Sequence, residues 1–164
     1  PIVVVQHMPP NFTKALAWRL DGLSQLAIKE AAEGDRLQMN QVLIAPGGVH
    51  LELKRMGSIV QTKLRDGPQV SSHKPSVDVM MKSAAAIFGS RCLGVIMTGM
   101  GRDGSDGCGE IRRAGGYVLG QDEDSSDVYG MNKVAFVEGN VDRQFSLDEA
   151  ARTLGLHVRR LWLR

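Results

Sequence analysis

Cysteine is scarce in this sequence, with only Cys92 and Cys108 among 164 residues. Two cysteines are too few for a disulfide framework, and these two show neither C-x-x-C spacing nor the Cys/His spacing of a zinc site. We therefore expect free structural thiols in a reducing compartment. The sequence also lacks His, Asp and Glu clusters with metal-ligand spacing, so we predict no metal ion and no other cofactor.

Long apolar runs and an excess of charge of one sign are missing too. No apolar segment approaches the ~20 residues that span a bilayer, and no signal peptide is visible, so we expect a soluble, cytoplasmic chain without membrane insertion. The 20 Lys and Arg residues stand against 18 Asp and Glu, for a formal net charge of +2. Because most of these charges are interspersed, we predict no nucleic-acid partner.

What is present is an alternation of strand and helix patterns without a shift in composition, which predicts one domain over residues 1–164 and, by default, a monomer. We predict strands at 2–5, 26–31, 41–46, 92–97 and 117–121, a hairpin over 50–64, and helices at 12–23, 75–89, 106–116 and 130–139. The C-terminal HVRRLWLR is interpreted as a solvated helix end. The alternation predicts an α/β fold with a doubly wound, mostly parallel sheet and an antiparallel hairpin, in a Rossmann-like three-layer architecture.

The glycine-rich stretch LGVIMTGMGRDGSDG, residues 93–107, can be interpreted in two ways. Gly99, Gly101 and Gly104 form G-x-G-x-x-G after a predicted strand, the pattern that holds a dinucleotide pyrophosphate at a helix N-terminus. Asp103 argues against this, because a carboxylate has the wrong charge for an anion-binding loop. The alternative is that the loop mounts Asp103 as a functional group.

His7 stands where the first predicted strand ends, and Asp103 follows another strand. Catalytic groups of open α/β sheets gather at the carboxyl ends of strands. If the two strands are neighbours, the imidazole and the carboxylate meet. They then match two parts of a three-part catalytic relay, in which a base activates a nucleophile and a third group orients the base. A loop histidine and a loop aspartate are also common as ordinary polar partners or caps, so the residues alone leave both interpretations open.

Five stretches of the sequence belong together: VVVQHMPPNFTKALAWRL, IAPGGVHLEL, DGPQVSSHKPSVDVMMKSAA, GVIMTGMGRDGSDG and GQDEDSSDVYGM. In this order and spacing they resemble the catalytic domain of the chemotaxis receptor methylesterases, the CheB family. The resemblance implies a doubly wound α/β fold and hydrolysis of glutamyl methyl esters on chemoreceptors, with glutamine deamidation in many members. The implied partners are the methylated cytoplasmic helices of chemoreceptors.

The resemblance also implies roles for individual residues. His7 matches the general base, Asp103 the triad aspartate, and the backbone N–H of Met100 an oxyanion-hole donor. The family's nucleophile is a serine in a G-x-S-T-G-G motif on a strand that comes before VVVQH. We therefore expect residues 1–164 to be an N-terminally incomplete catalytic domain, inactive alone, without the phosphorylatable receiver domain that usually precedes it.

His50 and His73 also fall within these stretches. The simpler interpretation is that His50 begins the hairpin and His73 anchors the turn before Pro75, while a place at the rim of the substrate site is the alternative for both. Two other functions stay open for the chain. One is a non-catalytic receptor-binding or regulatory module of the same fold, and the other, with less support, is a dinucleotide-binding domain.

Overall fold

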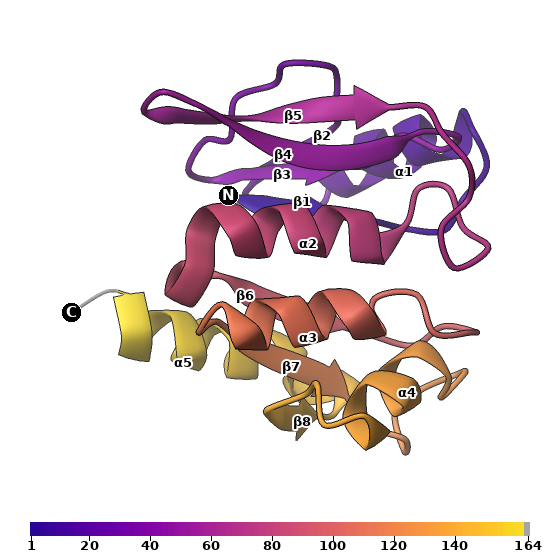
Figure 1. Ribbon diagram of the computed structural model, residues 1–164, viewed down its shortest axis with the longest axis vertical. Helices are drawn as coiled ribbons and strands as arrows, with labels where there is room; N and C mark the ends of the chain where they lie inside the picture. Colours follow the sequence, from indigo (N-terminus) through magenta and orange to yellow (C-terminus); the bar gives the residue numbers. More distant parts are fainter. Residues whose placement is uncertain (163–164) are drawn as a thin grey trace.

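Strands and helices alternate along the chain in the computed structural model, which describes residues 1–162 (Figure 1). The strands are β1 (Ile2–Val4), β2 (Ala27–Glu30), β3 (Gln41–Ile44), β4 (His50–Met56), β5 (Ile59–Arg65), β6 (Leu93–Ile96), β7 (Tyr117–Gln121) and β8 (Arg143–Phe145). The helices are α1 (Phe12–Asp21), α2 (Val77–Phe88), α3 (Ser105–Arg113), α4 (Met131–Val137) and α5 (Ala150–Trp162). Every predicted strand and helix thus has a counterpart close to its expected place.

The strands form two parallel sheets and one antiparallel hairpin. Parallel pairing orders the first sheet β1-β3-β2 and the second β6-β7-β8, while β4 and β5 pair antiparallel. The predicted α/β class with mostly parallel strands and a hairpin is confirmed. Among residues 1–162, however, no strand joins β1 to β6, so the parallel strands form two separate sheets rather than one.

Helices cover the strands on both sides, which gives the predicted three layers (Figure 1). In this view α2, α3 and α4 lie in front of the sheets, and α1 and α5 lie behind them. α2 packs against β4 on one side and against α3 on the other, so it lies between the two halves of the molecule. Leu51, Met81 and Ile111 are among the buried side chains of this shared core.

β1 is more exposed than the sequence predicts. The apolar run at residues 2–5 predicts a strand buried on both faces, but Ile2 is 51% exposed and Val3 and Val4 are only partly buried. β1 pairs with β3 along one edge, and no other described strand covers its second edge. Such an edge keeps N–H and C=O groups that a further strand can pair with.

The buried side chains of α1 are the small ones of Thr13 and Ala17, and not the large apolar residues at its start and just after its end. Phe12 is 61% exposed and Leu23 77%, whereas Thr13 is fully buried. The Thr13 hydroxyl donates a hydrogen bond to Glu30 of β2 at 2.6 Å and accepts one from the Gly47 N–H at 3.0 Å. Thr13 therefore joins α1 to the first sheet and to the loop that follows β3.

Gly47 brings that loop against the segment that carries His7. A Cβ atom at Gly47 would lie 2.5 Å from the backbone carbonyl carbon of Pro9, so the approach is possible only without a side chain. The loop after β3 thus supports the turn after β1, and the position of His7 depends on this contact.

The C-terminal part of the chain adds two elements that the sequence pattern shows only in part. β8 has no counterpart among the predicted strands. α5 includes the predicted helix end and begins before it, while Leu163 and Arg164 lie outside the described residues. The His157 ring packs on Tyr117 with 4.2 Å between centroids, so this helix is packed against β7 and is not solvated all round.

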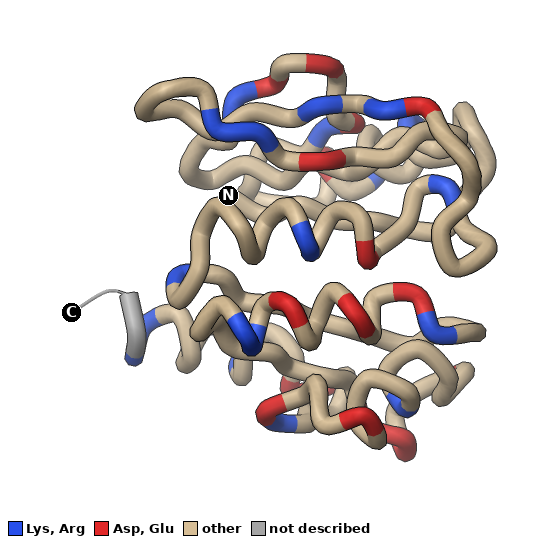
Figure 2. The backbone as a smooth tube through the Cα atoms, in the orientation of Figure 1, with Lys and Arg blue, Asp and Glu red and all other residues tan. Residues whose placement is uncertain are grey.

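Charge is spread over the whole chain, as the sequence indicates. Figure 2 shows Lys and Arg interspersed with Asp and Glu on both sheets and on the helices. Asp78 stands in the first turn of α2 and Asp106 in that of α3, where a helix N-terminus stabilises negative charge. None of the helices described over residues 1–162 has the length and apolar content needed to cross a membrane.

Candidate active site

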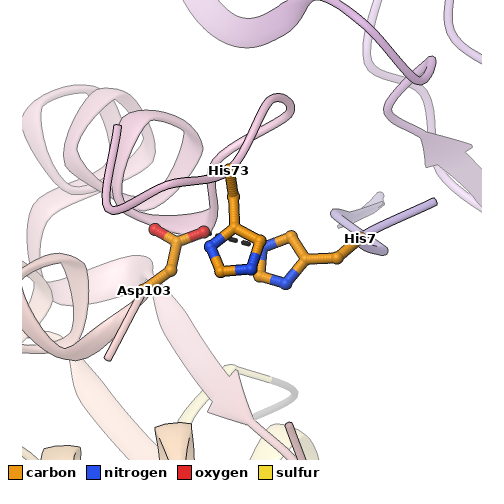
Figure 3. A group of neighbouring side chains, drawn as sticks. All are labelled: His7, His73 and Asp103. Atoms are coloured by element: carbon orange, nitrogen blue, oxygen red, sulfur yellow. Dashed lines mark hydrogen bonds and ion pairs between the residues drawn. The ribbon is translucent and has the colours of Figure 1, made fainter. Parts of the chain in front are cut away.

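His7 and Asp103 are 96 positions apart in the sequence and meet through a hydrogen bond (Figure 3). His7 follows β1, and Asp103 lies in the loop between β6 and α3. The His7 Nε2 atom and the Asp103 Oδ2 atom are 2.7 Å apart. The carboxyl ends of the two strands therefore bring the imidazole and the carboxylate together as predicted, although β1 and β6 are not paired with each other.

Asp103 is fully buried and accepts four hydrogen bonds. Its Oδ2 accepts from His7 Nε2 and from the Val77 N–H, both at 2.7 Å, and its Oδ1 accepts from the Ser76 hydroxyl at 2.7 Å and from the Asp78 N–H at 3.0 Å. Burial alone would raise the pKa of Asp103, but the hydrogen bonds from His7, Ser76 and the two amides outweigh it and lower the pKa. The carboxylate is thus held in its ionised form.

Acid should weaken the fold through Asp103. Because its pKa is lower in the folded protein than in the unfolded chain, its contribution to stability is present above about pH 4 and is lost as the pH falls through the folded-state pKa. We expect the melting temperature to fall with pH in that acid range, and to fall less steeply in an Asp103→Asn variant. Thermal unfolding followed by circular dichroism at a series of pH values measures both slopes. Equal acid sensitivity of the two proteins would contradict this assignment.

His73 lies flat against His7 in the same site (Figure 3). The two ring centroids are 3.7 Å apart and the ring planes differ by 11°. The His73 Nδ1–H donates a hydrogen bond to the Ser71 carbonyl oxygen at 2.7 Å, which fixes the ring. Both histidines line a pocket of about 260 Å³, together with Met8, Pro9, Gln69, Ser72, Lys74 and Pro75. His73 therefore anchors its turn, as the simpler interpretation predicts, and its place at a substrate rim stays a prediction.

His50 occupies a different environment from the predicted substrate rim. It is fully buried at the start of β4, its Nδ1 accepts a hydrogen bond from the Ser76 N–H at 3.2 Å, and its Nε2–H donates to the Pro68 carbonyl at 2.9 Å. His50 begins the hairpin, as the simpler interpretation predicts, and because both ring nitrogens are bonded inside the protein the alternative of a rim position is wrong. His50 instead supports the segment that leads into α2.

The G-x-G-x-x-G loop folds around Asp103 and leaves no anion site at the start of α3. Gly101 and Gly104 have φ values of 93° and 95°, a conformation that favours glycine. The N–H groups of Gly104 and Gly107, where a pyrophosphate would bind, donate instead to Asp78 Oδ1 at 3.0 and 2.7 Å. A carboxylate of the chain itself takes the place of a bound anion, which disfavours the dinucleotide interpretation.

Met100 lies in the same loop and is 78% exposed. The preceding residue fixes the loop, because the Gly99 N–H donates to the Val128 carbonyl at 3.0 Å and the Gly99 carbonyl accepts from the Met131 N–H at 2.7 Å. Within residues 1–162, the Met100 N–H donates no hydrogen bond to a protein group. It is therefore free to bind a ligand oxygen, as an oxyanion-hole donor must be, and that role stays a prediction.

One group of side chains has the spacing of a metal site. His7, His73 and Asp103 each place a ligand atom within 4.8 Å of the others. Two features disfavour an ion there. The imidazole rings are nearly parallel, so their nitrogen lone pairs do not converge on one point, and the Asp103 oxygens already accept four hydrogen bonds. The arrangement fits a proton relay better than metal coordination.

Ser76 and Asp78 belong to the site although the sequence does not single them out. A serine at a helix start indicates an ordinary N-cap, but the Ser76 side chain makes no cap bond to α2 and donates to Asp103 instead. An acidic residue in a first turn indicates pairing with its own helix dipole. No signal in a single sequence shows that Asp78 binds the start of α3.

Comparisons with known proteins find a family model and several relatives that match this chain. Residues 1–154 match the family described as CheB methylesterase. The chain is 51% identical over 153 residues to a protein-glutamate methylesterase/protein-glutamine glutaminase of Xanthomonas oryzae and 49% identical over 152 residues to one of Geobacter metallireducens. Each match covers 93% of this chain but only 44% and 43% of those relatives, so the chain spans less than half of their length.

The fold also has a solved counterpart. The crystal structure of the Thermotoga maritima CheB methylesterase catalytic domain matches the chain with a TM-score of 0.91 and 41% sequence identity. The match covers 94% of this chain and 82% of that one.

Proposed function

The chain belongs to the CheB methylesterase family, and from that premise we propose that it is the catalytic domain of a protein-glutamate methylesterase. The proposed reaction is hydrolysis of glutamyl methyl esters on the cytoplasmic helices of chemoreceptors. Deamidation of receptor glutamines would use the same groups, with ammonia in place of methanol as the leaving group. The observation that carries the proposal is the 2.7 Å hydrogen bond between His7 and Asp103, beside a pocket that His7 lines.

The proposed mechanism is acyl transfer through a serine. The serine oxygen attacks the ester carbonyl carbon while His7 takes the hydroxyl proton. Since His7 Nε2 is bonded to Asp103, Nδ1 is the nitrogen that accepts this proton. The ionised Asp103 stabilises the resulting imidazolium, and the Met100 N–H donates to the oxyanion.

The second half of the reaction uses the same proton path. His7 returns its proton to the methoxy oxygen, the bond between this oxygen and the carbonyl carbon breaks, and methanol leaves. Water then attacks the acyl-enzyme while His7 takes a proton from it. His7 passes this proton to the serine oxygen as the bond between that oxygen and the acyl carbon breaks, which frees the glutamate carboxyl group and the serine hydroxyl.

The nucleophile is proposed to lie before Pro1 in the whole protein, as the family resemblance implies. Two serines near the site are already engaged, because Ser76 donates to Asp103 and Ser105 donates to Glu138. β1 and β6 each have one edge without a described partner strand, and a strand that carries the serine could pair there. A regulatory receiver domain is proposed for the same part of the whole protein.

Methanol release from a methylated chemoreceptor tests the proposal. We expect the full-length protein to release methanol from this substrate. If it binds the receptor without releasing methanol, the chain is instead a non-catalytic receptor-binding or regulatory module. A saturable fluorescence change on titration with NAD(H) would favour the dinucleotide interpretation over both.

A further inference from the structure

The starts of α2 and α3 exchange acidic side chains. Asp103, which lies just before α3, accepts hydrogen bonds from the Val77 and Asp78 N–H groups at the start of α2. Asp78, in the first turn of α2, accepts through Oδ1 from the Gly104 and Gly107 N–H groups at the start of α3. Each helix is thus capped by a carboxylate of the other. We call this arrangement the crossed caps.

Within the crossed caps, Asp78 holds Asp103 at two points. The Asp78 N–H donates to Asp103 Oδ1 at 3.0 Å, and Asp78 Oδ1 accepts at 3.0 Å from the N–H of Gly104, the residue that follows Asp103. The first bond fixes the carboxylate, and the second fixes the backbone that carries it. Asp103 therefore cannot shift relative to α2 without breaking one of these bonds.

The oxygen of Asp78, more than its charge, makes these contacts. Asp78 is fully buried, and this burial raises the pKa of its carboxyl group. The hydrogen bond from the Gly107 N–H lowers that pKa, whereas the nearby charges of Asp103 and Asp106 raise it further. Its second oxygen is 3.4 Å from the Ser71 hydroxyl. An asparagine could keep both amide bonds through its oxygen and donate to Ser71 through its nitrogen, whereas an alanine removes the acceptor.

We propose that Asp78 is a positioning residue for the reaction: it holds Asp103 in the orientation that meets His7 and does not itself contact the substrate. This inference rests on the proposed function for its effect on turnover. Its geometric part, the effect of Asp78 on the bond between Asp103 and His7, is independent of any activity.

Two substitutions in the full-length protein separate geometry from charge. We expect Asp78→Ala to lower kcat about a hundredfold with KM nearly unchanged, because a displacement of about 1 Å in a catalytic group has an effect of that size. We expect Asp78→Asn to restore kcat to within about threefold of the wild type, since the acceptor is kept. Methanol release from a methylated receptor gives both constants.

A helix-destabilising substitution outside the crossed caps is the control. Ala84 lies on the same helix, and Ala84→Gly weakens this helix without removing any cap. We expect this variant to keep its kcat at temperatures where it is folded. If Asp78→Ala loses no more kcat than Ala84→Gly at an equal folded fraction, Asp78 serves stability alone and the proposal is wrong. A kcat as low in Asp78→Asn as in Asp78→Ala would also overturn it, because charge would then be the cause.

A spectroscopic measurement keeps this inference separate from the proposed function. The ¹⁵N chemical shift of His7 Nε2 reports its bond to Asp103, and a His7→Gln variant assigns the signal. We expect the shift to move in Asp78→Ala and to stay at the wild-type value in Asp78→Asn and Ala84→Gly. An unmoved signal in Asp78→Ala would overturn the inference. Absence of methanol release with the expected shifts would overturn only the proposed function.

Discussion

Residues 1–164 alone are expected to release methanol from a methylated receptor about a millionfold more slowly than a form extended upstream through the family's serine motif. His7 and Asp103 supply a base and its orienting group, but the proposed acyl-enzyme needs a nucleophilic oxygen beside them. The buried hydroxyls of Ser76 and Ser105 are already hydrogen-bonded to carboxylates. Some acceleration over water can remain, because an oxyanion donor acts without the nucleophile.

The measurement compares methanol release by the two forms on the same methylated receptor. A third form, extended by the same motif with alanine in place of its serine, controls for any effect of the added segment on folding. It should be as slow as residues 1–164. Equally fast methanol release by all three forms would show that a serine within the chain is the nucleophile. Ser72 would then be substituted first, because it lines the pocket beside His7.

The second large effect is expected for Asp103→Asn, which should lower turnover of the full-length protein about ten-thousandfold, as the equivalent change does in a serine protease. The amide favours the wrong tautomer of His7. It also removes the negative charge that stabilises the imidazolium. Methanol release under substrate saturation measures the loss.

The same substitution should also weaken the fold, because the environment of Asp103 consists mainly of donors. His7, Val77 and Asp78 all donate N–H groups to its oxygens. An amide nitrogen in place of either oxygen leaves one of these donors unpaired, at a cost of about 1–3 kcal/mol. Chemical denaturation of the same variant measures this cost.

Asp106→Asn provides the matched control for Asp103→Asn. It makes the same chemical change in the first turn of α3, where the side chain is 45% exposed and pairs with Arg102 and Lys82 at the surface. Exposed pairs of this kind contribute about 1 kcal/mol or less, so both turnover and stability should stay near the wild type. A loss of turnover below tenfold in Asp103→Asn would remove Asp103 from the proposed relay.

The meeting of His7 and Asp103 is the part of the site that the sequence predicts best. Both residues follow strands, and the carboxyl ends of parallel strands lie on one side of an α/β fold. The roles of Ser76 and Asp78 could not be predicted, because they depend on how the starts of α2 and α3 are placed against each other. Helix periodicity describes each helix alone and carries no information on that placement.

The burial of individual residues is harder to predict than the positions of the helices and strands. The apolar run of β1 indicates full burial, yet burial depends on which strands lie on either side, and β1 has only one described neighbour. α1 departs in a similar way, since the apolar residue Phe12 is exposed while the polar residue Thr13 next to it is buried. The position of His50 in a functional motif leaves a rim role open in the sequence, but both its ring nitrogens bond backbone groups inside the protein.

Because the strands form two separate sheets, the distance between His7 and Asp103 depends on how the two halves of the molecule are placed against each other. His7 follows a strand of the first sheet and Asp103 a strand of the second, and α2 packs between the halves against β4 and α3. A relative slip of about 1 Å between the halves is small for a packed fold but large for a catalytic distance. A change that shifts one half of the molecule against the other should therefore lower turnover before it lowers the melting temperature, whereas a substitution that only weakens α2 should not.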